Sequence, residues 1–292
     1  MTPAVTAEAG GARYSRTLVM HDRMRRAALR ALLACALVVP GLARASDVPN
    51  VAAASDLQFA LPEIVAAFRR ETGHDVRLSF GSSGNFRRQI ADGAPFELFL
   101  SADAAYTEAL FREGRTVDAG VVYAIGRLAL VVPKDSPIAL DGELRGLAAA
   151  LAAGHITRFA IANPEHAPYG RAAREALTRA GLWKAIEPRL VLGENVSQAA
   201  QFATSGATQG GIVAYSLARA PGMDARARSL LLPRTLHAPL VQRMVLLRNA
   251  GATARLFYAY LQQAPAQSIL ARYGFDVPPA AGGSNAARRP PT

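Results

Sequence analysis

Two serines lie between two glycines at Gly81-Ser82-Ser83-Gly84, directly after an apolar run and just before a basic segment. A glycine- and serine-rich turn between a strand and a helix leaves backbone N–H groups unpaired, and together with the helix dipole these groups can hold an anion. The serine hydroxyls add hydrogen-bond donors without adding charge. The same stretch could also be the nucleophile turn of a serine hydrolase, or an ordinary flexible turn.

Similar junctions occur at three other places in the chain. Ser55 follows an expected strand at 50–54, and "NPEHAPYG" (163–170) and "GENVSQ" (193–198) each join an expected strand to an expected helix. Ligands of open parallel sheets bind at the carboxyl ends of the strands. We therefore expect the small polar residues of these four junctions to form one anion-binding site.

Other chemistries lack their sequence signatures. A nucleotide-binding phosphate loop requires G-x-x-x-x-G-K-[ST], which does not follow Gly81, and the only lysines are Lys134 and Lys184. The nucleophile elbow G-x-S-x-G fails because position 85 is Asn. Neither G-x-G-x-x-G nor H-E-x-x-H occurs, and the five histidines show no spacing typical of metal ligands.

Alternating apolar bursts and amphipathic segments must position these junctions. The pattern predicts an α/β fold with parallel sheets and no internal repeat. Pro62 requires either that the first helix starts near Leu61 or that a separate short turn covers 56–60. The expected strands are 50–55, 75–80, 96–100, 127–133, 158–164, 189–195, 210–216 and 240–247. The expected helices run from Leu61 to about Gly73, then over 85–92, 104–113, 143–153, 170–180, 196–205, 252–263 and 265–273.

Bulk composition is that of a globular chain. The 292 residues are 51% hydrophobic and 19% charged, with a formal net charge of +11 carried almost entirely by arginine. The arginines are scattered singly and in pairs between acidic residues, whereas a nucleic-acid binder clusters its charge with interleaved aromatic residues. We therefore expect no nucleic-acid partner.

The N-terminal segment has the layout of a secretory leader. Met24–Ala45 has a basic start, an apolar middle and a small-x-small end, which predicts cleavage after Ala45; Met1, Met20 and Met24 are all possible starts. The only cysteine, Cys35, lies inside this leader, and Arg30 would truncate the apolar run of a lipoprotein signal. The mature protein is then thiol-free, without disulfides or thiolate metal sites, and is expected in the periplasm.

The order of motifs identifies a resemblance to a known family. The stretch "VAAASDLQFALPEIVAAFRRETGHDVRLSFGSSGNFRRQIADGAPFELFLSAD" resembles the opening of the periplasmic molybdate-binding proteins of ABC importers. The resemblance continues through "NPEHAPYGRAAREAL", "GENVSQA", "GGIVAYS" and "LARYGF", and covers roughly 50–277.

The resemblance implies a two-lobed periplasmic-binding-protein-like fold of type II. Each lobe would hold a mixed, mostly parallel sheet flanked by helices, with the ligand in the cleft between the lobes. The implied division, after the leader at 1–45, is 46–125 for lobe 1, 126–236 for lobe 2, 237–277 for the rest of lobe 1 and 278–292 for a disordered tail.

The implied function is the capture of molybdate, or tungstate, and its delivery to the membrane permease subunits of an ABC importer. The protein would be a monomer without enzymatic activity, cofactor or resident metal. Motif by motif, the oxyanion-binding residues would be Ser55, Ser83, Tyr169 and the backbone of Val196, with Ala102 as a further backbone donor.

The roles of four further residues are open. Some family members place a binding tyrosine directly after "GIV", where this chain has Ala214, so we expect Tyr215 to be structural. A carboxylate repels a dianion, so we expect Asp56 to face away and to complement a helix N-terminus. Arg87 and Arg88 either attract the anion at long range or form a solvated helix face.

Two alternative functions remain open from the sequence. The first is a binding protein for another tetrahedral oxyanion, phosphate or sulfate, and a ligand that carries a proton would explain Asp56. The second is a secreted serine hydrolase that uses Ser83.

Overall fold

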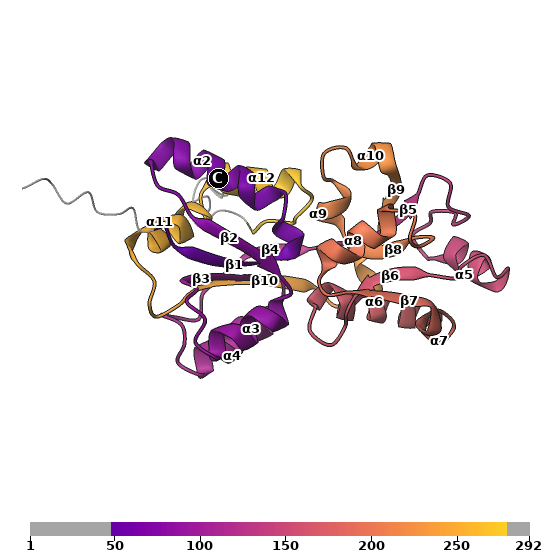
Figure 1. Cartoon of the computed structure of the whole chain (residues 1–292), viewed down its shortest axis with the longest axis horizontal. Helices are drawn as coiled ribbons and strands as arrows, with labels where there is room; N and C mark the ends of the chain where they lie inside the picture. The colour runs from indigo at the N-terminus through magenta and orange to yellow at the C-terminus, as the bar shows by residue number, and fades with distance from the viewer. Residues whose placement is uncertain (1–47, 279–292) are drawn as a thin grey trace, which may run out of the picture. The chain divides into compact units, whose positions relative to one another are not determined.

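The computed structural model describes residues 48–278. The expected leader at 1–45 and nearly all of the expected tail at 278–292 lie outside the described residues. Within the described part, ten strands form two five-stranded sheets flanked by helices (Figure 1). The α/β two-lobed fold expected from the sequence is thereby confirmed, and we call each sheet with its helices a lobe.

The first lobe is built on the sheet with strand order β2-β1-β3-β10-β4. β1 pairs in parallel with β2 and β3, while β10 is antiparallel to β3 and β4. Helices α2 and α12 cover one face of this sheet and α3 and α4 the other (Figure 1). The elements are β1 (Asn50–Ala54), α2 (Ala60–Thr72), β2 (Arg77–Gly81), α3 (Ser83–Ala91), β3 (Leu98–Ser101), α4 (Ala104–Arg112), β4 (Val121–Gly126), β10 (Leu240–Leu246), α11 (Ala252–Tyr260) and α12 (Ala264–Arg272).

The second lobe is built on the sheet with strand order β7-β6-β8-β5-β9. β6 is parallel to β7 and β8, and β5 runs antiparallel to β8 and β9. Both sheets are therefore mixed, each with one strand opposed to the other four. The elements are β5 (Leu128–Pro133), α5 (Arg145–Ala152), β6 (Phe159–Ala162), α6 (Pro168–Arg179), α7 (Trp183–Ile186), β7 (Leu190–Gly193), α8 (Val196–Thr204), β8 (Gly211–Ala214), α9 (Tyr215–Ala218), α10 (Met223–Arg226) and β9 (Ala227–Leu231).

The chain passes between the two sheets twice. The first passage is direct, because β4 ends at Gly126 and β5 begins at Leu128. The second leads from β9 through the one-turn 3₁₀ helix η3 (Arg234–Leu236) into β10. The exact lobe boundaries, at 125/126 and 236/237, stay a prediction.

Several local features differ from the sequence-based expectation. Two strands, β4 and β9, were not expected at all, and the strand expected over 210–216 ends at Ala214, where α9 begins. The two explanations offered for Pro62 both hold. A one-turn 3₁₀ helix, η1 (Ser55–Leu57), precedes α2, and Pro62 is the third residue of α2, where its missing N–H costs no helical hydrogen bond.

Aromatic packing fixes α2 against the C-terminal helices of the first lobe. The Phe68 side chain is fully buried, and its ring meets the rings of Phe257 and Tyr260 edge-on at centroid distances of 5.0 and 5.4 Å. Edge-to-face pairs add to the free energy gained from burial itself. Because α2 follows η1 directly, this contact also anchors the junction at Ser55.

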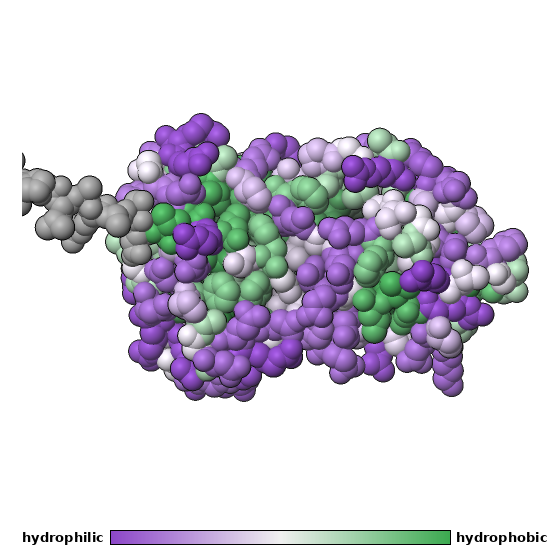
Figure 2. Space-filling view, viewed as in Figure 1, coloured by the Kyte–Doolittle hydropathy of each residue, from purple (hydrophilic) through white to green (hydrophobic). Residues whose placement is uncertain are grey.

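The surface of the described residues is mixed. Figure 2 shows a mostly polar face with separate apolar patches. The exposed large apolar side chains come from different elements and are Phe59, Phe111, Val117, Leu192 and Leu256. Within residues 48–278, no helix combines the length and the apolar character needed to cross a membrane.

Replacing Phe68 by Ala is expected to lower the free energy of unfolding by about 3–5 kcal/mol, because a fully packed ring leaves a cavity. Phe59→Ala, nine residues earlier at a side chain that is 39% exposed, is the matched control and should cost about 1 kcal/mol or less. Urea denaturation of both variants measures the difference. Equal losses would contradict the packing described here.

Candidate anion-binding site

The four serine- and glycine-rich junctions meet at one narrow cavity. Ser55 and Ser83 reach it from the first lobe, and Tyr169 and Val196 from the second. The convergence at strand ends therefore agrees with the expectation. The full lining consists of Ala54, Ser55, Asp56, Gly81, Ser82, Ser83, Ala102, Ala167, Pro168, Tyr169 and Val196, and it contains no lysine, arginine or histidine.

Both predicted serines are buried and oriented by backbone donors. The Ser83 Oγ accepts a hydrogen bond from the Ala102 N–H at 3.0 Å, and the Ser55 Oγ accepts one from the Ser197 N–H at 3.3 Å. In the described part of the chain neither hydroxyl donates to a protein acceptor. Each O–H hydrogen is therefore free to point at an acceptor in the cavity. Ala102, expected as a direct donor, instead orients Ser83.

Val196 contributes through its backbone. It is the first residue of α8, whose N-cap Asn195 accepts hydrogen bonds from the N–H groups of Ser197 and Gln198. The Val196 N–H has no partner within the helix, and none elsewhere among residues 48–278. Val196 lines the cavity, so this donor and the positive end of the α8 dipole lie at the cavity wall.

Asp56 does not face away from the site, so that expectation is wrong. Its carboxylate is buried, and Oδ2 accepts hydrogen bonds from the Tyr169 hydroxyl at 2.8 Å and from Gln242 Nε2 at 2.6 Å. Burial raises the pKa of Asp56 to about 6, although these two hydrogen bonds oppose the shift. A raised carboxyl pKa is common at functional sites.

Tyr169 is engaged by this carboxylate. Burial raises the pKa of its hydroxyl well above 10, and the nearby charge of Asp56 acts in the same direction, so it remains a neutral donor. Its oxygen also accepts a hydrogen bond from Gln242 Nε2 at 3.0 Å. Gln242 is in turn oriented by the Tyr123 hydroxyl, which donates to its Oε1 at 2.7 Å. Neither Gln242 nor Tyr123 was predicted from the sequence as part of the site.

The lobes are also joined at the rim of the cavity. The Gly84 N–H donates to the His166 carbonyl at 3.0 Å, and the Ser82 hydroxyl contacts His166 Nδ1 at 2.9 Å. His166 Nε2 lies 3.5 Å from a carboxylate oxygen of Glu194, which also accepts a hydrogen bond from Asn85. These contacts place the Ser82–Gly84 turn directly against the second lobe.

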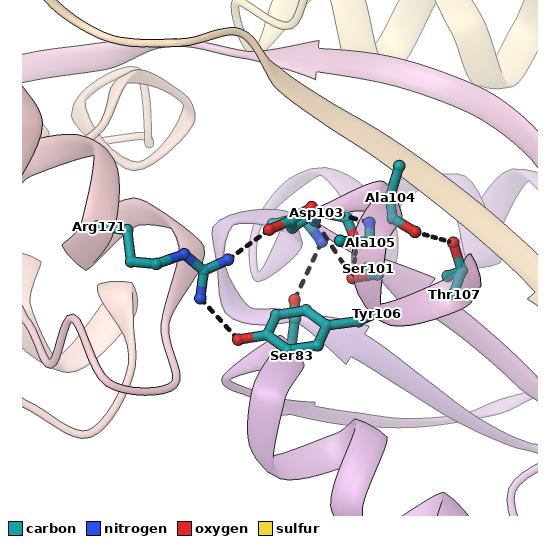
Figure 3. A network of polar contacts seen from close by, with 9 residues as sticks. Ser83, Ser101, Asp103, Ala104, Ala105, Tyr106, Thr107 and Arg171 are labelled. Atoms are coloured by element: carbon teal, nitrogen blue, oxygen red, sulfur yellow. Dashed lines mark hydrogen bonds and ion pairs between the residues drawn. The ribbon is translucent and has the colours of Figure 1, made fainter. Parts of the chain in front are cut away.

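A second connection, shown in Figure 3, links Ser83 to the opposite lobe through the β3–α4 turn. Asp103, the N-cap of α4, pairs with Arg171 from α6, and Arg171 Nη1 donates to the Tyr106 hydroxyl at 2.6 Å. Asp103 follows Ala102, whose N–H binds Ser83, and Arg171 lies two residues after Tyr169. The Asp103–Arg171 ion pair thus lies close in sequence to two cavity residues, Ala102 and Tyr169.

The remaining predicted residues lie outside the cavity. Arg87 pairs with Glu113 and Arg88 with Asn85, so both belong to the surface of α3. Tyr215 packs against Gly274. Residues 48–278 contain no group of three or more His, Cys, Asp or Glu side chains that could hold a metal ion.

Comparison with known proteins identifies the family of this chain. The sequence pattern of the bacterial extracellular solute-binding proteins matches residues 49–276. The chain belongs to this family. It is 37% identical over 252 residues to the molybdate-binding protein ModA of Rhodobacter capsulatus, which covers 85% of this chain and 96% of the relative. The ModA of Azotobacter vinelandii is 35% identical over 247 residues, 84% of this chain and 93% of that protein.

A solved structure resembles the fold as well. The periplasmic molybdate-binding protein of Azotobacter vinelandii superimposes with a TM-score of 0.72 at 30% identity, covering 79% of this chain and 99% of that one. The two-lobed fold of this solute-binding protein is therefore similar to that of a family member of known structure.

Replacing Gly84 by Ala should hinder closure of the lobes. A methyl group at this position would lie 2.6 Å from the His166 carbonyl oxygen, a backbone atom of the other lobe. We expect a longer distance between spin labels on α3 and α6 than in the unsubstituted protein. Gln89→Ala, at an exposed position on the same helix, should leave the distance unchanged. An unaltered distance in Gly84→Ala would show that the rim contact does not form in solution.

Asp56 should make the stability of the solute-binding protein depend on pH. Its folded-state pKa of about 6 exceeds the ordinary 3.8, so its contribution to stability is fully present below the unfolded pKa and is lost as pH rises through 6. The shift corresponds to about 3 kcal/mol. The Asp56→Asn variant lacks this pH-dependent contribution. Its unfolding free energy minus that of the unsubstituted protein should therefore increase by about that amount between pH 4 and pH 8. Urea titrations at both pH values measure it, and a constant offset would contradict the shift.

Proposed function

We propose that this solute-binding protein captures molybdate outside the cytoplasmic membrane, in the periplasm, and delivers it to the permease of an ABC importer. The observation that carries the proposal is the set of neutral donors aimed at one cavity. Ser55 and Ser83 each accept a backbone N–H and keep their own O–H hydrogen for a ligand. The names of the relatives support molybdate as the ligand.

Neutral donors suit this ligand physically. A fully deprotonated tetrahedral dianion offers only acceptor oxygens, so donors alone can satisfy it. Hydrogen bonds to a charged partner contribute roughly 1.5–3 kcal/mol each before the cost of desolvation. A five-atom ligand is limited to about −1.5 kcal/mol per atom, which corresponds to roughly micromolar affinity. Tight capture therefore requires that most oxygens are met and that water is excluded, which closure of two lobes achieves.

In this proposal Ser55, Ser83 and the Val196 N–H contact the oxygens of the anion. Tyr169 does so once its hydroxyl, which donates to Asp56 Oδ2 in this structure, turns toward the anion. The protein makes no bond to the molybdenum atom. Tungstate, which has the same shape and charge, would occupy the same cavity. The protein acts as a binding protein, without a cofactor and without catalysis. Transfer of the anion to permease subunits, and a monomeric state, follow from the family resemblance.

The position of Asp56 favours one competing ligand. A carboxylate that lines the cavity would accept a hydrogen bond from an oxyanion that carries a proton, as hydrogen phosphate does. Calorimetric titration of the purified protein with molybdate, tungstate, sulfate and phosphate in parallel separates the candidates. We expect molybdate and tungstate to bind. Binding of phosphate alone would overturn the assignment.

The hydrolase alternative receives no support from the contacts of Ser83. Among the described residues its hydroxyl contacts only the Ala102 N–H, and no histidine lies within hydrogen-bonding distance. The serine that does contact a histidine is Ser82, and the carboxylate beyond that histidine belongs to Glu194, whose side chain is 58% exposed. A catalytic orienting carboxylate is normally buried.

Replacing Ser83 by Ala removes one charge-assisted hydrogen bond and should weaken molybdate binding tenfold or more. Ser205→Ala, at an exposed serine just after α8, should bind as the unsubstituted protein does. Calorimetry gives both dissociation constants. An unchanged titration curve for Ser83→Ala would remove this residue from the site.

A further inference from the structure

The two oxygens of the Asp56 carboxylate are treated differently by the protein. Oδ2 accepts two hydrogen bonds, one from Tyr169 and one from Gln242. Oδ1 is buried and has no hydrogen-bond partner within residues 48–278. The backbone N–H groups of Asp56 and Leu57 are near enough to lower the pKa of the carboxyl, but neither forms a hydrogen bond of acceptable geometry with Oδ1.

An unpartnered oxygen on a buried, ionised carboxylate is costly, because the desolvated charge receives no compensation. Protonation removes this cost and turns Oδ1 into an O–H donor. Asp56 lines the same cavity as Ser55, Ser83, Tyr169 and Val196. A protonated Oδ1 would therefore join a set of neutral donors around the anion, whereas an ionised one would repel it.

No cationic group among residues 48–278 compensates the charge of Asp56. The ionisable side chains that contact or face it are the hydroxyls of Tyr169 on α6 and, through Gln242, of Tyr123 on β4. Of the elements packed against η1, α8 has no ionisable side chain, and β2 carries only Arg77, which donates to Asn50. The third element packed against η1 is α9. Its only ionisable side chain is Tyr215, which packs on Gly274. Burial thus dominates, and the pKa of Asp56 is raised to about 6 before any anion is present.

We infer that the cavity takes up one proton together with a fully deprotonated tetrahedral oxyanion, and that Asp56 Oδ1 holds this proton and donates it in a hydrogen bond to an oxygen of the anion. The inference rests on the proposed function and specifies the chemistry of that site. The proton comes from solvent and no covalent bond of the ligand changes. An anion that already carries a proton would instead donate its own proton to the ionised Oδ1.

The coupling between proton and anion is reciprocal. A dianion beside Asp56 favours the protonated carboxyl, and the protonated carboxyl favours the dianion to the same extent. Above the pKa of Asp56 in the free protein, each unit of pH should weaken the binding of a dianion by up to about tenfold. Below that pKa the affinity should level off. The lining contains no histidine and no other carboxylate. Any pH dependence of the affinity that arises in the lining near neutrality is therefore assigned to Asp56.

The test is calorimetric titration of the full chain with sodium molybdate at pH 8, in two buffers of different ionisation enthalpy. The difference in observed heat gives the number of protons taken up. We expect a value approaching one, and a dissociation constant that rises about tenfold between pH 7 and pH 8. Asp56→Asn should bind molybdate with no proton uptake and little pH dependence. Asp92→Asn, which removes an exposed carboxylate at the end of α3, should behave as the unsubstituted protein.

The outcomes separate the inference from the proposed function. Molybdate binding without proton uptake in the unsubstituted protein, or uptake that persists in Asp56→Asn, overturns the inference and leaves the function intact. Absence of molybdate binding overturns the function itself. Phosphate binding with little proton uptake at pH 8 would show that the anion brings its own proton.

If Asp56→Asn does not fold, infrared difference spectra of the unsubstituted protein decide the matter. The carbonyl stretch of a protonated carboxyl should appear when molybdate is added, and its absence overturns the inference.

Discussion

A small anion can be taken out of water only where each of its oxygens meets a donor, and this requirement explains how the cavity is built. Serine hydroxyls and helix N-terminal N–H groups supply donors without a counter-charge. The anion is therefore held by the positions of its hydrogen-bond donors and not by an opposite charge. The donors cannot come from one loop, because a tetrahedron must be approached from several sides. Two sheets that present their strand ends to each other meet this need, with Ser55 and Ser83 on one side and Val196 on the other.

The supporting contacts show that each donor is positioned by a second group. Ala102 orients Ser83, Ser197 orients Ser55, and Asn195 caps the helix that presents Val196. The acid at position 56 is the exception, since one of its oxygens has no partner among the residues that the structure describes. A site of neutral donors that contains one carboxyl can change its preference with the state of that carboxyl, which serines and amides cannot do.

Much of this could be read from the sequence, because strand ends and small polar turns are local patterns. The positions of Ser55, Ser83 and Val196 follow from a strand, a turn and a helix in succession. The environment of Asp56 does not, because its partners Tyr169 and Gln242 lie 113 and 186 positions away. A local argument assigned the carboxylate to its own helix terminus, whereas tertiary packing placed it in the cavity. Strand β4 was missed for a related reason: the chain passes from one sheet to the other at Arg127 with no turn residues to separate β4 from β5.

The one-turn helix η1 belongs to the first lobe but is held by the second. Ser216 of α9 donates to the Asp56 carbonyl at 2.8 Å, and Ser197 of α8 contacts both Ser55 and Gln58. Separation of the lobes must therefore break these hydrogen bonds as well as bend the two connecting segments. Hydrogen bonds from two helices of the second lobe therefore oppose the detachment of this short turn, and with it the separation of the lobes.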